Sequence, residues 1–267
     1  MSWLNRKDLA LAVKDIRDGI GSIYIWPMLG WQDIKQRYRR SVIGPFWLTI
    51  SYGAMIGGMG PLYGRLLQQN ISDYFSYLAI SFVVWILVSG ILTETCNAFI
   101  SAEGTIKQIK LPLTTHVLRV VWRHVIIFLH NFLIVVLVML FYQPSVGWSL
   151  LSVPLGVLAI AINAIWIGLL LAILCARFGD VPQVVSSFVQ VAFFLTPVMW
   201  RPEMLGSKQW LTAFNPLFHL LEIVRTPLLG APTAVLSWAV VLMMVIIGFP
   251  LTMMLFSRVR ARIAYWV

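Results

Sequence analysis

One carboxylate, Glu94, lies well inside an apolar stretch of the sequence. A charged side chain at membrane depth is costly, and it usually faces a neighbouring helix or an internal aqueous space. Arg119 and Arg123 lie near the start of the next apolar stretch, and we expect Glu94 to pair with one of them. A proton relay would need a chain of such groups, which the sequence does not provide.

No residue pattern typical of catalysis is present. The sequence has no phosphate-binding loop of the form G-x-x-x-x-G-K-[ST] and no H-E-x-x-H, paired CxxC or G-x-S-x-G motif. Snorkelling or helix–helix hydrogen bonds explain His116 and His124, whereas the deeper His130 could face an internal aqueous path. We therefore expect no catalytic residue, no metal site and no cofactor held by this chain.

Aromatic side chains are abundant, with 12 Trp, 8 Tyr and 15 Phe. Belts at the membrane interface explain many of them. Others could line a path for sugar rings, because an aromatic face stacks on a pyranose face without demanding one fixed register. The candidates for such a path are Trp47, Tyr52, Tyr63, Tyr77, Trp85, Phe188, Phe193 and Phe194.

The composition indicates what kind of protein positions these residues. The 267 residues are 60% hydrophobic and 11% charged, whereas soluble domains carry about 25% charged residues. These values exclude a disordered chain, a disulfide scaffold and an ordinary soluble enzyme, and they predict a polytopic membrane protein. The net charge of +10 then indicates contact with anionic lipid or a partner rather than with nucleic acid.

The apolar stretches predict an all-α integral membrane protein with six transmembrane helices, because a spanning helix needs about 20 apolar residues. The predicted spans are residues 43–67, 74–99, 117–141, 150–175, 183–199 and 234–257. Within residues 200–232, the apolar stretch 210–230 is interrupted by Pro216, Pro227 and Gly230. A periplasmic re-entrant or interfacial hairpin between spans five and six suits that stretch better than a further span.

Basic residues concentrate before the first span, between spans two and three, and after the last span. The positive-inside rule therefore predicts that both termini are cytoplasmic. Residues 1–41 form a cytoplasmic segment before the transmembrane domain of 42–267. Within it, Leu9, Val13, Ile16 and Ile20 share one face of a predicted amphipathic helix at 5–20. This helix is either a membrane-surface anchor or also a docking site for a cytoplasmic protein.

Two cytoplasmic connections and one glycine pattern leave alternatives open. Residues 101–112 and 177–183 are either plain loops or handles on which another subunit pushes. The pairs Gly53/Gly57 and Gly60/Gly64 allow close helix approach, either inside one protomer or at a subunit interface or conduit.

Several motifs along the chain resemble those of type-two ABC exporter permeases that move polysaccharides, and most closely those of lipopolysaccharide O-antigen exporters. Capsule and teichoic-acid exporters are near relatives. The matching segments are R-Y-R-R-S-V-I-G-P-F-W at 37–47, K-L-P at 110–112, D-V-P-Q at 180–183, T-P-V-M-W at 196–200, N-P-L at 215–217 with Arg225, and R-I-A-Y-W at 262–266. One departure is Gly179, where the family often carries a basic residue.

The resemblance implies a homodimer of permeases in the bacterial inner membrane, paired with two ATP-binding cassette subunits that bind ATP and Mg. The implied cargo is a glycan on a polyprenyl diphosphate lipid, moved from the cytoplasm to the periplasm. The residues implied to receive the push of the ATPase are Glu103, Gly104, Lys107, Lys110, Asp180 and Gln183. Arg37, Arg39 and Arg40 are candidates for attracting the lipid diphosphate.

Two other classes of function remain open from the sequence. An ATP-independent carrier or channel would share the apolar composition. A membrane-embedded enzyme that modifies glycolipids would need clustered acids or histidines near a membrane surface, and the sequence shows no such cluster.

Overall fold

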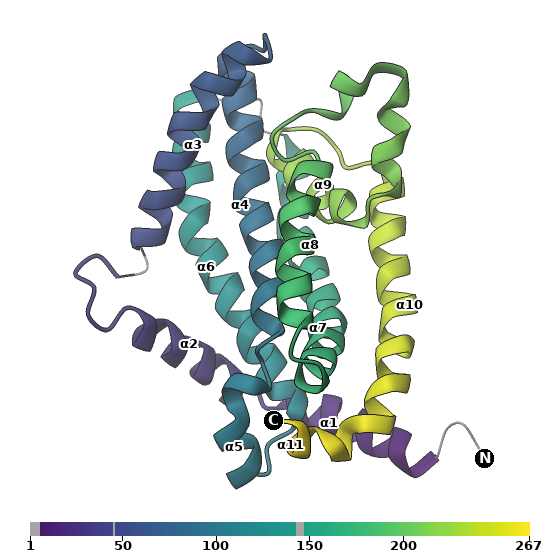
Figure 1. Cartoon of the computed structure of the whole chain (residues 1–267). Helices are drawn as coiled ribbons and strands as arrows, with labels where there is room; N and C mark the ends of the chain where they lie inside the picture. Colours follow the sequence, from purple (N-terminus) through teal and green to yellow (C-terminus); the bar gives the residue numbers. More distant parts are fainter. Residues whose placement is uncertain (1–5, 45, 143–146) are drawn as a thin grey trace.

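The computed structural model describes residues 6–44, 46–142 and 147–267, and these residues form a helical bundle (Figure 1). The prediction of an all-α protein is confirmed, since the described residues contain no strand. Pro45 of the predicted entry motif, and residue 5 of the predicted amphipathic helix, lie outside the described residues.

The α-helices follow one another in a simple order. They are α1 (Arg6–Gly21), α2 (Ile25–Arg37), α3 (Phe46–Leu66), α4 (Ile71–Thr95), α5 (Glu103–Gln108), α6 (Leu113–Tyr142), α7 (Val153–Arg177), α8 (Val181–Leu195), α9 (Pro216–Leu228), α10 (Val235–Val259) and α11 (Ile263–Trp266). Short 3₁₀ segments connect them, namely η1 (Ile100–Ala102), η2 (Trp148–Ser152), η3 (Pro202–Phe214) and η4 (Arg260–Arg262).

Among the described residues, four helical stretches are long and apolar enough to cross a membrane. They cover Ile71–Thr95, Leu113–Tyr142, Trp148–Arg177 and Val235–Trp266, and they match the predicted spans two, three, four and six. The helix at the predicted span five, α8, has only 15 residues. Helix α3, at span one, is rich in glycine, which lowers its hydropathy. The total of six spans therefore stays a prediction.

Helix α4 is the centre of the bundle. In its most apolar window 78% of the residues are buried, against 22% for α10. It packs against α3, α6, α7, α8 and α9. Helix α10 instead exposes Leu242, Ile246 and Leu251, as expected of a helix that faces lipid. Side chains on α4 are therefore the best placed to bind other elements together.

The stretch predicted as a hairpin folds into η3 and α9. Gly206 interrupts η3 with a φ of 55°, a conformation that glycine adopts without strain. The Asn215 side chain then caps α9 by accepting hydrogen bonds from the backbone N–H groups of Leu217 and Phe218. Helix α9 packs against α4, α7 and α10. A re-entrant position of this stretch in the membrane stays a prediction.

The connecting elements gather at two opposite ends of the bundle (Figure 1). Helices α1, α5 and α11 and the turn between α7 and α8 lie at one end, which we call the α5 end. Segment η3 and the start of α4 lie at the other end, which we call the η3 end. The side of the membrane that each end faces stays a prediction.

Helix α1 docks on the bundle through the buried Asp15 together with Ala12 and Ile16, while other residues of its predicted apolar face stay exposed. Asp15 is 2% exposed, whereas Val13 is 51% and Ile20 is 47% exposed. The Asp15 carboxylate accepts hydrogen bonds from the N–H groups of Leu113 (3.1 Å) and Thr114 (3.0 Å), and it pairs with Arg260 Nε at 2.9 Å. It therefore caps the first turn of α6 from another helix. The exposed apolar residues suit either a membrane-surface anchor or a docking site for a cytoplasmic protein, so both alternatives stay open.

The two glycine pairs of α3 differ in what surrounds them. A Cβ at Gly60 would lie 2.3 Å from the Phe75 ring, and one at Gly64 would lie 3.4 Å from Tyr74. This pair therefore serves close packing against α4 inside the protomer. A Cβ at Gly53 or Gly57 would meet nothing within 4 Å. That part of α3 keeps an open small-residue face.

Candidate functional site

An ion-pair network at the α5 end joins α2, α4 and α6. Glu94 at the end of α4 pairs with Arg123 of α6 and with Arg37 of α2, the latter at 3.0 Å. Arg123 also donates to Asp33 at 2.6 Å, and Arg119 pairs with the same carboxylate. The expected pairing of Glu94 with Arg123 is confirmed, whereas Arg119 turns instead to Asp33.

The network satisfies charges that would be costly if they were left alone near a membrane. The Asp33 side chain is 11% exposed and that of Arg123 is 12% exposed. His124 Nε2 adds a contact 3.1 Å from Glu94 Oε2. The sequence analysis did not single out Asp33, because helix α2 gave no sign of contacting residues some 86 to 90 positions away.

Beside this network lies a cavity of about 640 Å³ between α3, α4, α6 and α8, which we call the Glu94 cavity. Its polar end is formed by Arg37 and Glu94. Its aromatic wall contains four of the predicted path residues, Tyr52, Trp85, Phe193 and Phe194. The structure thus brings one predicted diphosphate residue and four predicted path residues into a single space.

The aromatic wall is held in place by ring-to-ring contacts. Phe193 packs edge-on to Phe82 and to Phe194, with ring centroids 5.4 Å and 5.3 Å apart, and it lies 5.7 Å from Trp85. Such contacts add about 0.5–1.5 kcal/mol each beyond the burial of area. The contacts of Phe193 with Phe82 and Trp85 hold the short helix α8 against α4, and both helices line the cavity.

Close packing of α4 and α6 also shapes the Glu94 cavity. A Cβ at Gly90 would lie 2.5 Å from the His124 ring, so only glycine allows the imidazole to lie flat beside α4. Gly90 and His124 both line the cavity. A larger residue at position 90 would displace the ring and with it the contact to Glu94.

The other predicted path and diphosphate residues lie elsewhere. Trp47 and Phe188 are exposed, at 57% and 60%, and Tyr63 is half-buried on α3. None of these three lines the Glu94 cavity. Arg39 and Arg40 are exposed in the connection after α2 and lie outside it too. Between Arg37 and Arg39, burial raises the pKa of the Tyr38 phenol, which therefore stays protonated.

The predicted coupling residues are exposed at the α5 end (Figure 1). Glu103, Gly104 and Lys107 lie on α5, where Lys107 Nζ pairs with Glu103 at 2.6 Å. Lys110 follows in the short link to α6. Asp180 and Gln183 lie at the turn into α8, where the Asp180 carbonyl accepts from the Gln183 N–H at 3.1 Å. Arg177, just before this turn, lies over the Trp266 ring of α11 at 5.3 Å.

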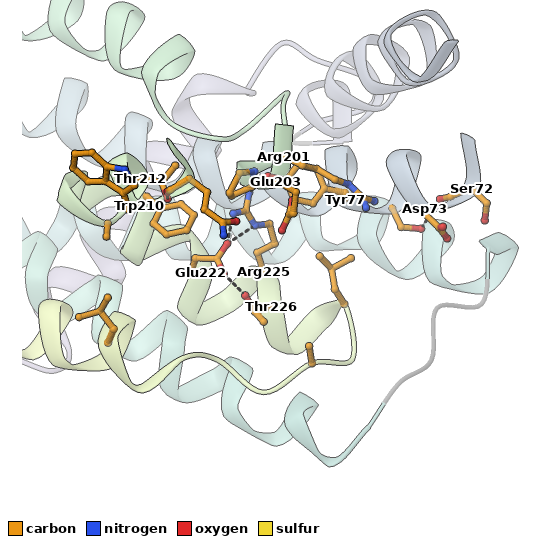
Figure 2. A pocket seen from close by; sticks show the side chains of 18 of the residues that line it. Ser72, Asp73, Tyr77, Arg201, Glu203, Trp210, Thr212, Glu222, Arg225 and Thr226 are labelled. Atoms are coloured by element: carbon orange, nitrogen blue, oxygen red, sulfur yellow. Dashed lines mark hydrogen bonds and ion pairs between the residues drawn. The ribbon is translucent and has the colours of Figure 1, made fainter. Parts of the chain in front are cut away.

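A second cavity, of about 860 Å³, lies at the η3 end and is shown in Figure 2. We call it the Arg225 cavity. Arg225 of α9 is 1% exposed and pairs with Glu222, and its Nη1 donates to the Tyr77 hydroxyl at 2.7 Å and to Ser81 at 3.1 Å. It also donates to the Pro197 carbonyl after α8. Arg225 therefore ties α9 to α4 and α8.

One of the predicted path residues, Tyr77, lines this second cavity. Tyr77 is 5% exposed, and its hydroxyl donates to the backbone carbonyls of Pro197 and Trp200, both at 2.9 Å. It lies at the wall of the Arg225 cavity, apart from the four aromatics that line the Glu94 cavity. The sequence analysis identified Arg225 only as part of a motif, since its partners come from distant parts of the chain.

A bundle of long apolar helices with two cavities that carry charged and aromatic residues is typical of a polytopic membrane protein. The comparison with protein families then identifies the class. Residues 26–229 match the ABC-2 type transporter family, and the chain belongs to that family. This is a family of transporters rather than of enzymes, and the resemblance seen in the sequence is confirmed.

The curated relatives agree with one another. An O-antigen export system permease protein RfbA of Klebsiella pneumoniae is 24% identical over 241 residues, which cover 87% of this chain and 91% of the relative. A protein of the same name from Myxococcus xanthus is 21% identical over 224 residues, which cover 78% of this chain and 86% of the relative. This chain is therefore similar to O-antigen export permeases over most of its length.

Proposed function

We propose that the chain is the transmembrane subunit of an ABC transporter that exports a lipid-linked polysaccharide, O-antigen being the favoured cargo, across the bacterial inner membrane. The curated relatives carry that export function in their names. The observation that carries the proposal is the Glu94 cavity, which joins a basic side chain to an aromatic wall within one protomer. A polyprenyl diphosphate glycan offers both a phosphate and sugar rings.

The cavity gives each group a positioning role and no covalent one. Arg37 already has Glu94 as a partner, and its side chain is 44% exposed. An incoming diphosphate competes with Glu94 for the guanidinium, while Arg123 still compensates the carboxylate. Sugar rings that follow meet Tyr52, Trp85 and Phe194, whose faces tolerate many sugar registers.

Energy for export comes from a separate ATPase subunit in this proposal, because the sequence has no phosphate-binding loop. Helix α5 exposes Glu103 and Lys107 at the surface and is linked to α6 by residues 109–112. Helix α6 carries Arg123, and its first turn is capped by Asp15. A push on α5 therefore reaches both the Glu94 cavity and α1.

Two copies of the permease and two ATPase subunits complete the proposed assembly. The open face of α3 at Gly53 and Gly57 supports close approach of a second copy. The exposed rings of Phe188 and Phe194 on α8 would line a conduit between two copies. Both termini and the α5 end face the cytoplasm in this arrangement, as the distribution of basic residues predicts.

The coupling role of α5 is tested by replacing both Glu103 and Lys107 with alanine. The exposed pair contributes only about 0.3–0.5 kcal/mol, so its loss leaves the fold intact. We expect the variant to assemble with the ATPase and to hydrolyse ATP, while surface glycan measured on intact cells falls at least fivefold.

Lys208→Ala is the matched control, because Lys208 is exposed at the η3 end, away from α5. It should leave both hydrolysis and export at wild-type levels. Normal export by the α5 double variant contradicts the coupling role. A permease that never co-purifies with a nucleotide-binding subunit contradicts the proposed function and favours an ATP-independent carrier.

A further inference from the structure

The Arg225 cavity holds polar groups that the protein itself leaves unpaired. The Nε atom of Arg201 is buried and has no hydrogen-bond partner among the described residues. Asp73 and Glu203 line the same space without an ion pair to any described residue. Figure 2 shows Arg201 and Glu203 beside Tyr77, with Asp73 further along the wall. Asp73 and Glu203 are exposed, so the two carboxylates and the Arg201 guanidinium offer hydrogen-bond partners to a polar ligand in this cavity.

The charge of the cavity excludes a phosphate as the preferred ligand. Arg225 is already neutralised by Glu222, whose other oxygen accepts from Thr226. The remaining ionisable groups of the wall are Arg201, Asp73 and Glu203, which leave one negative charge in excess. An anion would be repelled there. Among the described residues, no cluster of three acidic, histidine or cysteine side chains could hold a metal ion.

Aromatic surface completes the wall. Trp210 on η3 is 58% exposed and lines the cavity, and it packs edge-on to Phe214 with ring centroids 5.8 Å apart. Phe218 of α9 and Tyr77 of α4 line the same space. An indole face in a cavity that also holds carboxylates and a guanidinium suits a pyranose, whose C–H face stacks on the ring. Its hydroxyls, which both donate and accept, then bridge the charged groups.

We propose that the Arg225 cavity is a second saccharide site, which takes one or two neutral sugar units of the glycan at the η3 end of the same protomer. A volume of about 860 Å³ is within the usual range for small-molecule sites. Trp210 provides the stacking face, Glu203 and Asp73 accept from sugar hydroxyls, and the Arg201 guanidinium donates to one. The site rests on the proposed function only for the identity of its natural ligand.

The position of the cavity gives the site a role in export. The Glu94 cavity lies beside the ion network of the α5 end, and the Arg225 cavity lies at the η3 end, so in the proposed direction of export the first cavity comes before the second. Because Arg225 ties α9 to α4 and to the end of α8, a sugar held here contacts the elements that also frame the first cavity. The second site would hold leading sugar units while the following ones move.

Binding is tested on the purified permease–ATPase complex in lipid nanodiscs without ATP, since maltoside detergents would supply sugar themselves. The probes are glucose, galactose, mannose and N-acetylglucosamine, and the readout is saturation-transfer NMR with titration. We expect at least one probe to bind the wild type. We expect its affinity to fall at least fivefold in Trp210→Ala and in Glu203→Gln. Trp148→Ala is the matched control, because Trp148 is 90% exposed and lies outside the cavity.

Export of cellular glycan by the same variants separates this proposal from the proposed function. If no probe binds, or if all four proteins bind equally, the saccharide site is overturned even when the wild type exports glycan normally. If binding depends on Trp210 but neither the wild-type complex nor any variant exports glycan, the saccharide site stands and the proposed function fails. The saccharide site and the proposed function are both supported if binding depends on Trp210 and if export is slowed by Trp210→Ala but not by Trp148→Ala.

Discussion

At the scale of single residues, buried charges in this protein join distant segments. Asp15 caps the first turn of α6 and pairs with Arg260, so one side chain connects the start, the middle and the end of the chain. Arg225 connects α9, α4 and the end of α8 in the same way. Each arrangement concentrates several interactions in one side chain, so single substitutions should have large effects.

We expect Asp15→Ala to lower the free energy of unfolding by about 3 kcal/mol. The change leaves two α6 N–H groups without their acceptor and a partly buried Arg260 without its partner. Thermal or denaturant unfolding of the purified permease measures the effect. Asp18→Asn, at an exposed position of the same helix, should unfold like the wild type. Equal stability of the Asp15 variant and the wild type would show that α1 is held by other contacts.

We expect Arg225→Leu to cost roughly 3–5 kcal/mol of stability, because it leaves Glu222 as an uncompensated charge in a largely buried place. The double variant Arg225→Leu with Glu222→Leu should recover part of this loss, since it removes both charges. A double-mutant cycle from unfolding curves measures the coupling. Strictly additive effects of the two substitutions would contradict a direct pair.

At the scale of elements, glycines set how closely the helices approach. A Cβ at Gly156 of α7 would lie 2.5 Å from the backbone oxygen of Ile223 on α9, and a backbone atom cannot move aside cheaply. The predicted hairpin region is therefore packed tightly on α7. By contrast, a Cβ at Gly57 would meet no described atom within 4 Å, so this face of α3 is open.

We expect Gly156→Leu to destabilise the protomer by several kcal/mol through overpacking against α9. Gly57→Leu should leave the protomer's unfolding curve unchanged and weaken the association of two permease copies. Unfolding curves and light scattering of the purified permease measure the two effects separately. If Gly57→Leu leaves the oligomeric state unchanged, the open face of α3 is not the dimer contact.

The sequence predicted the long apolar helices well and their polar partners poorly. Hydropathy located α4, α6, α7 and α10, because each carries enough apolar residues to satisfy a simple length criterion. It placed the start of α6 at residue 117 rather than at Leu113, since His116 and nearby polar groups lower the local hydropathy. Asp15 caps the first turn of α6 and Asp33 pairs with Arg119 and Arg123 further along it, and only the tertiary structure shows these partners.

The candidate sites also depend on tertiary contacts, which the sequence alone does not reveal. Residue type singled out aromatic side chains, but it could not assign Tyr77 and Trp85 to different cavities along one helix. The assignment depends on where α8 ends and where α9 returns to α4. The ion pair between Glu94 and Arg123 was predictable because apolar surroundings leave a lone carboxylate few alternatives.

At the scale of the whole molecule, the chain combines two cavities with an apolar helical bundle, and its sequence has no phosphate-binding loop. Its charged and aromatic cavities lie toward opposite ends of a bundle whose centre is the buried helix α4. The ABC-2 type transporter family, to which it belongs, agrees with such a division of labour. The account therefore depends on a separate subunit that hydrolyses ATP.

The most direct test is export by purified components in proteoliposomes that contain a defined lipid-linked glycan. The account predicts that the permease with its ATPase moves the glycan across the bilayer when ATP is added. It also predicts that the permease alone, and the complex with a hydrolysis-deficient ATPase, do not. Glycan transport by the permease alone, at the rate of the full complex, would contradict the central claim.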